Sequence, residues 1–168
     1  AALETGKFKD GLQHATAFVT KYSDDHFLPD TKYVAADCHL KLAEYEPAEA
    51  AYRDLLVKYE GHAEYGAWQV RLGLVLSLQK KYDDAIKALQ PVVASLEEPT
   101  QIAEAQFILG ASQFQLDQFE TAAQSLAASL KAAPEWRQAD ETLLYLSRAQ
   151  RGLNQLEAAK TTVSKLIN

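Results

Sequence analysis

The chain has 168 residues, of which 48% are hydrophobic and 24% are charged, so it can bury a core and stay dispersed in water. Its formal net charge is −6 and no cluster of Lys and Arg interrupts the acidic balance, which argues against nucleic-acid binding. The single cysteine, Cys38, excludes an internal disulfide. No apolar run approaches the roughly 18 residues of a membrane-spanning helix.

The composition favours helices, because Ala and Leu are abundant while Gly and Pro number only 7 and 5. The first predicted helix covers about residues 5–22, where Phe8, Leu12, Ala15 and Val19 fall at helical spacing. A fifth helix begins near residue 82, and Pro91 is expected to kink or end it. The other helices are expected at about 29–43, 45–59, 62–79, 99–116, 118–132, 135–152 and 155–168. The short links between these nine helices place consecutive helices antiparallel.

An internal repeat of 37 residues relates these helices to one another. The first helix of each pair carries a small residue, and the second begins with an aromatic or apolar residue that is followed three positions later by another small residue. These three series are Ala36, Gly73, Gly110 and Ser147; Phe8, Tyr45, Tyr82, Phe119 and Leu156; and Gly11, Ala48, Ala85, Ala122 and Ala159. The chain is therefore predicted to be a stack of helical hairpins.

The repeat also predicts the domain organisation. We expect one domain over residues 1–168, with a half repeat at 1–28 and repeats at about 29–65, 66–102, 103–139 and 140–168. The chain contains no Met, and its last helix ends with the apolar residues Val163, Leu166 and Ile167. We therefore expect it to be a segment of a longer chain, or to have a partner packed against its last helix.

Two of the repeats resemble those of the tetratricopeptide repeat proteins. The first reads Leu72-Gly73 with Tyr82 and Ala85, and the second reads Leu109-Gly110 with Phe119, Ala122 and Pro134. The resemblance implies an all-α fold, a right-handed α-solenoid of antiparallel hairpins. It also implies a non-enzymatic scaffold that binds a peptide or helix of a partner protein in a concave groove.

In that family the first helix of each hairpin lines the groove, so the resemblance assigns candidate binding residues. They are Tyr33, Asp37, Leu40, Val70, Leu74, Phe107, Ala111, Phe114, Arg148 and Arg151. Phe107, Ala111 and Phe114 share one helical face and form the expected apolar floor, with the two arginines at one end and Asp37 at the other. Such a groove would accept an amphipathic helix or an extended peptide. In the alternative interpretation, the aromatic side chains pack against neighbouring helices.

The sequence predicts no catalytic residue, no cofactor and no metal site. The histidines lack metal-ligand spacing, and Cys38 and His39 are adjacent, so on a helix they diverge. Two alternatives to the scaffold function stay open. One is a regulatory or structural module of a larger enzyme or envelope assembly, and the other is self-association through apolar ends near Phe8 and Ile167.

A narrower resemblance concerns the cellular compartment. The segments Lys21-Tyr22-Ser23 and Lys58-Tyr59-Glu60 resemble the Tyr-Pro-x-Ser joint of lipoprotein and Tol–Pal-associated repeat proteins. In both segments another residue, Ser23 or Glu60, stands at the position of the Pro. This resemblance implies a bacterial protein of the periplasm or cell envelope rather than of the cytoplasm.

Overall fold

The fold consists of helical hairpins, as predicted. The computed structural model describes residues 2–166, with side chains from residue 6 onward, and within this part of the chain it contains nine α-helices, one short 3₁₀ helix and no strand. The contacts divide the chain into two compact units, Ala1–Gln79 and Lys80–Asn168, here called the N-terminal and C-terminal units. The prediction of a single domain over the whole chain stays a prediction.

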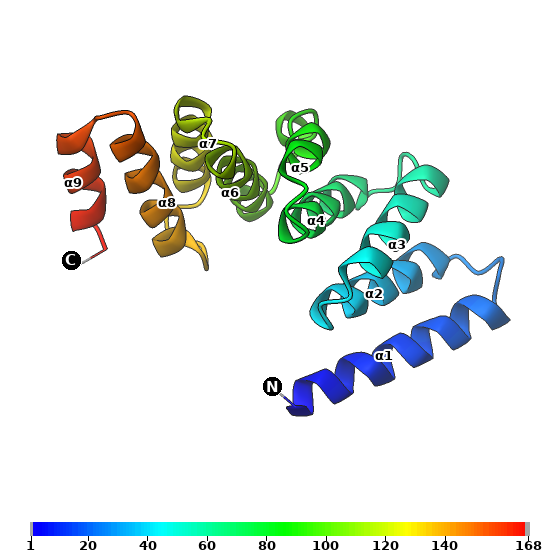
Figure 1. Cartoon of the computed structure of the whole chain (residues 1–168). Helices are drawn as coiled ribbons and strands as arrows, with labels where there is room; N and C mark the ends of the chain where they lie inside the picture. The colour runs from blue at the N-terminus through cyan, green and yellow to red at the C-terminus, as the bar shows by residue number, and fades with distance from the viewer. Residues whose placement is uncertain (1, 167–168) are drawn as a thin grey trace. The chain divides into compact units, whose positions relative to one another are not determined.

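The N-terminal unit contains four helices in which each helix packs against the next, as Figure 1 shows. Their bounds are α1 (Ala2–Lys21), α2 (Leu28–Lys41), α3 (Tyr45–Lys58) and α4 (Tyr65–Leu78). The small residues Ala36 and Ala48 are completely buried, so α2 and α3 can approach closely. The fully buried Tyr52 and Leu55 of α3 and the almost fully buried Trp68 of α4 fill the core.

The C-terminal unit begins with the shortest α-helix. Its elements are α5 (Tyr82–Leu89), η1 (Val93–Ser95), α6 (Pro99–Gln115), α7 (Phe119–Ala132), α8 (Ala139–Gly152) and α9 (Leu156–Ser164). Helix α5 ends two residues before Pro91, as the sequence predicted, because a proline has no backbone N–H to continue the helical ladder. The helices α6 to α9 then pack in chain order (Figure 1).

The predicted starts of two helices were too early. The fourth helix was expected from about residue 62, whereas α4 begins at Tyr65. The sequence indicated that the eighth helix begins at Glu135, whereas α8 begins at Ala139. Residues between them form a turn in which the Trp136 N–H donates to the Ala133 carbonyl and the Ala139 N–H donates to the Trp136 carbonyl. This turn buries the Trp136 side chain, of which 8% is exposed, so tertiary packing outweighs local helix preference.

The backbone shows the 37-residue repeat at a position that the sequence did not reveal. The four residues Ala43, Lys80, Asp117 and Asn154 follow the first helix of each hairpin, and their φ angles are 58°, 62°, 57° and 59°. This left-handed conformation ends a helix when the N–H of the following residue donates a hydrogen bond to a carbonyl oxygen of the last helical turn. Three such bonds are Glu44 N–H to His39 O at 2.9 Å, Gln118 N–H to Gln113 O at 3.0 Å and Gln155 N–H to Gln150 O at 2.9 Å.

The crossing of α6 and α7 requires a glycine. A Cβ atom added to Gly110 would lie 2.7 Å from Leu126 Cγ and 3.1 Å from the Ala122 carbonyl oxygen. Ala122 and Leu126 are themselves completely buried, so neither can move into solvent to make room. The small-residue series of the repeat therefore marks the contact between the two helices of this hairpin.

Candidate functional site

In the N-terminal unit, the predicted groove residues divide by burial. Leu40 of α2 and Val70 of α4 are buried, so these side chains take part mainly in helix packing. Tyr33, Asp37 and Leu74 stay partly exposed. The face formed by the first helices α2 and α4 therefore offers one aromatic, one acidic and one aliphatic side chain to a ligand.

The partly exposed Tyr33 lies close to a residue with a buried polar group. Its ring lies 6.1 Å from the ring of Tyr52, whose hydroxyl is buried and has no hydrogen-bond partner among the described residues. Burial raises the pKa of Tyr52 far above its usual value, Asp37 raises it further, and Arg71 partly opposes them. The charges of Asp37 on α2 and Arg71 on α4 thus act in opposite directions on the pKa of the same phenol.

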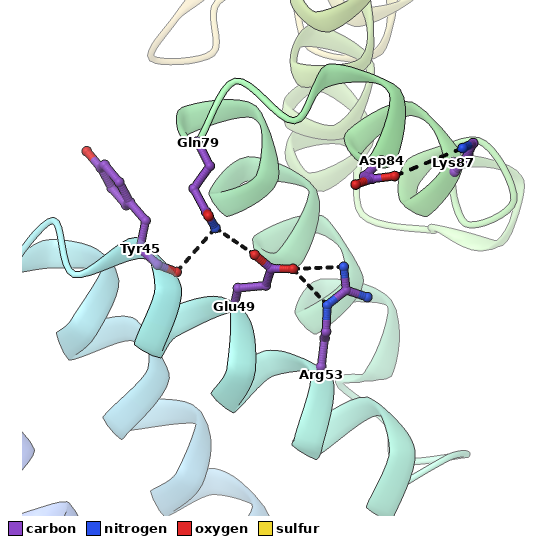
Figure 2. Close-up of polar contacts among 6 residues, drawn as sticks. All are labelled: Tyr45, Glu49, Arg53, Gln79, Asp84 and Lys87. Atoms are coloured by element: carbon purple, nitrogen blue, oxygen red, sulfur yellow. Dashed lines mark hydrogen bonds and ion pairs between the residues drawn. The ribbon is translucent and has the colours of Figure 1, made fainter.

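The end of α4 is fixed on α3 by one glutamine (Figure 2). The Gln79 amide donates to Glu49 Oε2 at 2.8 Å and to the Tyr45 carbonyl at 3.4 Å. Glu49 also accepts a hydrogen bond from Arg53 Nε at 2.9 Å. This carboxylate is therefore satisfied inside the repeat stack and is unavailable to a ligand.

In the C-terminal unit, aromatic rings link α6 to α8. The Phe107 ring lies 5.6 Å from Trp136 and 5.9 Å from Tyr145, and the Phe114 ring lies 5.5 Å from Tyr145 and 5.6 Å from Phe119. Phe107 is only 7% exposed, so its ring packs between helices, in line with the alternative interpretation of the aromatic residues. Phe114 and its neighbour Ala111 are partly exposed.

Tyr145 is a surface residue that the sequence analysis missed. It is half-buried, and it meets both Phe107 and Phe114 edge to face. The available signal was its spacing, because Tyr145 precedes Arg148 by three residues and so lies close to its face of the same helix. Phe114 and Tyr145 together form the aromatic part of the first-helix face in this unit.

Arg148 and Arg151 border a different neighbour of α8, the helix α9. Both are exposed, and neither forms an ion pair within the described residues. They line a groove of about 440 Å³ between α8 and α9, here called the end groove. Its apolar lining is Leu156, Ala159 and Val163. The predicted arginines thus border an apolar surface, but that surface belongs to α9 rather than to Phe107 and Phe114.

The residues considered for chemistry have structural roles. Cys38 is buried beside α1, where its Sγ would lie 3.2 Å from a Cβ atom on Gly11, and burial together with Asp37 raises the pKa of its thiol. His39 Nδ1 lies 2.7 Å from Glu44 Oε2. Within residues 2–166, no group of three or more His, Cys, Asp and Glu side chains is placed to hold a metal ion. Over the same range, every helix is too short or too polar to cross a membrane.

The fold is that of the tetratricopeptide-type helical repeat proteins, as the resemblance of the repeats predicted. Solved structures with this fold include MamA (residue 41 to the end) from Desulfovibrio magneticus RS-1, which is 20% identical with a TM-score of 0.82, over 98% of this chain and 86% of the solved MamA chain. The apo form of RapI is 15% identical with a TM-score of 0.77, over 90% of this chain and 60% of RapI.

A third solved structure contains a bound peptide. PlcR from Bacillus thuringiensis, in complex with the peptide PapR7 and DNA, is 9% identical with a TM-score of 0.71, over 98% of this chain and 65% of PlcR. No family model matches the chain, and no curated protein sequence matches it. Because the sequence identities are low, these structural similarities establish the shared fold and nothing further.

Proposed function

We propose that the chain is a non-enzymatic scaffold that binds a peptide or helix of a partner protein on the face formed by the first helices α6 and α8 of the C-terminal unit. The observation that supports this most directly is the Phe114–Tyr145 pair, whose rings lie 5.5 Å apart and stay partly exposed. Partly exposed aromatic side chains are rigid and apolar, which suits them to anchoring a partner. Ala111 beside this pair leaves space for the ligand's own side chains.

The fold supports this function because it separates packing from recognition. Buried small residues such as Ala36, Gly110 and Ala122 hold the hairpins together. The partly exposed residues of the first helices are then free to contact a ligand. The structurally similar PlcR was solved in complex with a peptide, which supports a peptide as the ligand proposed here. The proposal assigns no reaction to Cys38 or to the histidines.

A selection from a displayed peptide library would test this proposal. The immobilised chain is expected to enrich peptides that share an apolar motif. The variant Ala111→Lys should weaken binding of the enriched peptides by roughly tenfold or more, since it places a charge beside Phe114. Val57→Lys is the matched control, because Val57 is 81% exposed on the second helix α3.

Two results would contradict the proposal. One is the absence of any enriched motif. The other is equal loss of binding in Ala111→Lys and Val57→Lys, which would show that the peptides do not recognise the first-helix face. Circular dichroism of both variants should match that of the unmodified chain, so that a change in binding reports the surface and not the fold.

A further inference from the structure

The first helix α2 of the N-terminal unit carries two carboxylates on the face that holds Tyr33. Asp30, Tyr33 and Asp37 follow one another at spacings of three and four residues, so they share one side of the helix. Asp30 is exposed and Asp37 is partly exposed, and neither carboxylate forms a hydrogen bond or ion pair with another residue in the described part of the chain. The equivalent residues of α4 are the uncharged Ala67 and Leu74, so the next first helix does not repeat this acidic pair.

A buried hydroxyl group lies beside this face. Tyr52 of α3 is 0% exposed, its ring lies 6.1 Å from the Tyr33 ring, and its hydroxyl has no hydrogen-bond partner among the described residues. The next two second helices carry Leu89 and Leu126 at the same repeat position, so the packing of the hairpins does not require a hydroxyl there. A buried hydroxyl without a partner destabilises the folded chain. A ligand that supplies a hydrogen bond would remove that cost.

The charges around Asp37 indicate that the ligand is a cation. Burial raises the pKa of Tyr52, and Asp37 raises it further, in keeping with a carboxylate close to this hydroxyl. Two basic residues are near in the fold, Lys41 one turn further along α2 and Arg71 on α4, but neither forms an ion pair with Asp37 within residues 6–166. The carboxylate therefore stays available to a cationic group from outside the chain.

We propose that the face formed by Asp30, Tyr33 and Asp37, here called the acidic face, binds a basic extended segment of a partner protein. Two cationic side chains of the segment pair with the two carboxylates, and the Tyr33 ring contacts the cation or its aliphatic stem. The cation on Asp37 also donates to the Tyr52 hydroxyl oxygen after a side-chain rotation of Tyr33, a kind of change that is common at interfaces. This site lies in the N-terminal unit and does not depend on the function proposed for α6 and α8.

The spacing of the two carboxylates specifies the spacing of the cations. Asp30 and Asp37 are separated by seven residues of helix, or roughly 10 Å along its axis. An extended peptide rises about 3.3 Å per residue, so two of its side chains that are three residues apart span the same distance. The acidic face is therefore expected to prefer arginines separated by two residues over adjacent arginines.

The probe is the capped peptide acetyl-Gly-Arg-Ala-Leu-Arg-Gly-amide, labelled with an uncharged dye. Fluorescence anisotropy at low salt measures its binding to the complete chain. A peptide with Gln in place of both Arg residues should bind roughly tenfold more weakly or less, because it lacks the charge-assisted contacts. A peptide with adjacent Arg residues should also bind more weakly, and added salt should reduce the binding of the first peptide.

Variants of the chain locate the site. The double variant Asp30→Asn and Asp37→Asn should lose the preference for the Arg peptide. The matched control is Glu46→Gln with Glu60→Gln, which removes the same charge at two exposed positions in α3 and directly after it, and should keep the preference. Tyr52→Phe should weaken the Arg peptide several-fold while the chain is at least as stable to heat, since it deletes a buried hydroxyl that has no partner.

Four outcomes would overturn the proposal. The first is equal binding of the Arg and Gln peptides, or no binding of either. The second is an equal loss in the control double variant, which would show general attraction of a basic peptide to an acidic chain. The third is unchanged binding in Tyr52→Phe. The fourth is reversible dimerisation in sedimentation that Asp30→Asn with Asp37→Asn abolishes, which would assign the acidic face to a second copy of this chain.

Discussion

Ser125 donates a hydrogen bond from its Oγ to Gln113 Oε1 at 2.9 Å inside the α6–α7 hairpin, and both side chains are buried. One repeat later, Thr162 Oγ1 donates to Gln150 Oε1 at 2.8 Å in the α8–α9 hairpin. One repeat earlier, the same two positions are occupied by Leu76 and Ala88, which have no polar side-chain group. The same repeat positions therefore carry a hydrogen-bonded polar pair in two hairpins and apolar residue types one repeat earlier.

This pair gives a first prediction. Ser125→Ala should lower the free energy of unfolding by about 1–2 kcal/mol, because the Gln113 amide then stays buried without its donor. Adding Gln113→Leu should recover most of that loss, since the buried amide is then removed and the two substitutions reproduce the residue types found at the equivalent positions Leu76 and Ala88. Urea unfolding of the two single variants and the double variant gives the coupling energy. A double variant less stable than either single variant would show that the polar pair has no such apolar equivalent in this hairpin.

A second prediction concerns the helix crossing at Gly110. Gly110→Ala should destabilise the chain by about 1–3 kcal/mol, because the new methyl group meets Leu126 and the Ala122 carbonyl. The matched control is Gly6→Ala in α1, where an added Cβ atom meets nothing within 4 Å. That control should be neutral or stabilising by up to about 1 kcal/mol. Thermal unfolding of both variants separates crowding from the general effect of replacing glycine in a helix; equal shifts would refute the role of Gly110.

A third prediction uses the left-handed residues that follow the first helices. Ala43 has a φ of 58°, which a residue with a Cβ atom adopts at a cost of roughly 1–2 kcal/mol. Ala43→Gly should therefore raise the free energy of unfolding, by about 0.5–1 kcal/mol after the greater entropy of the unfolded glycine is subtracted. Ala50→Gly, at an exposed position inside α3, should lower it by a similar amount. The sign difference between the two alanine-to-glycine variants in denaturant titrations is the result to measure.

A fourth prediction concerns acid sensitivity. Asp54 Oδ1 lies 2.7 Å from Lys58 Nζ, and Asp54 Oδ2 lies 3.0 Å from Lys32 Nζ. Burial raises the pKa of Asp54, but the hydrogen bonds from the two lysines outweigh it, so the pKa falls below its ordinary value. A carboxyl group with a lowered pKa stabilises the folded state above its unfolded pKa of about 4, and that contribution is lost as the pH falls through the folded pKa.

Asp54→Asn should therefore be less stable than the unmodified chain near neutral pH, by about 0.5 kcal/mol for these partly exposed groups, and the gap should close in acid. The control is Asp84→Asn, because Asp84 is exposed and lies 4.0 Å from Lys87 (Figure 2). Unfolding midpoints between about pH 2 and pH 7 give both curves. A gap that persists unchanged in acid would exclude the lysine contacts as its cause.

The features predicted correctly from the sequence depend on local patterns that recur at constant spacing. The hairpin register followed from the aromatic series and the small-residue series, and Gly110 lies at the crossing where the pattern placed it. The end of α5 before Pro91 followed from the missing N–H of a proline. Each of these properties is determined by one residue or by neighbours within a helical turn.

The features missed depend on contacts between distant residues or on a weak residue signal. Ala43 follows α2 in a left-handed conformation that glycine usually adopts. Because the residue is an alanine, nothing in the sequence indicated this conformation. Phe107 was predicted to line a groove, but Trp136 and Tyr145, far away in the sequence, cover its ring. The burial of Trp136 also shifts the start of α8 from the predicted Glu135 to Ala139. Helical spacing identifies residues that share a face, but it does not say whether another helix covers that face.

The Ser125–Gln113 bond also restricts how hairpins of this chain can be recombined. Chimeras that join helix α6 to a second helix of the Ala88 type would bury an amide with no donor opposite it, even though the repeat length is preserved. Exchange points placed between hairpins avoid this mismatch, because both members of each internal pair then move together. The whole hairpin, rather than the single helix, is therefore the interchangeable module of this architecture.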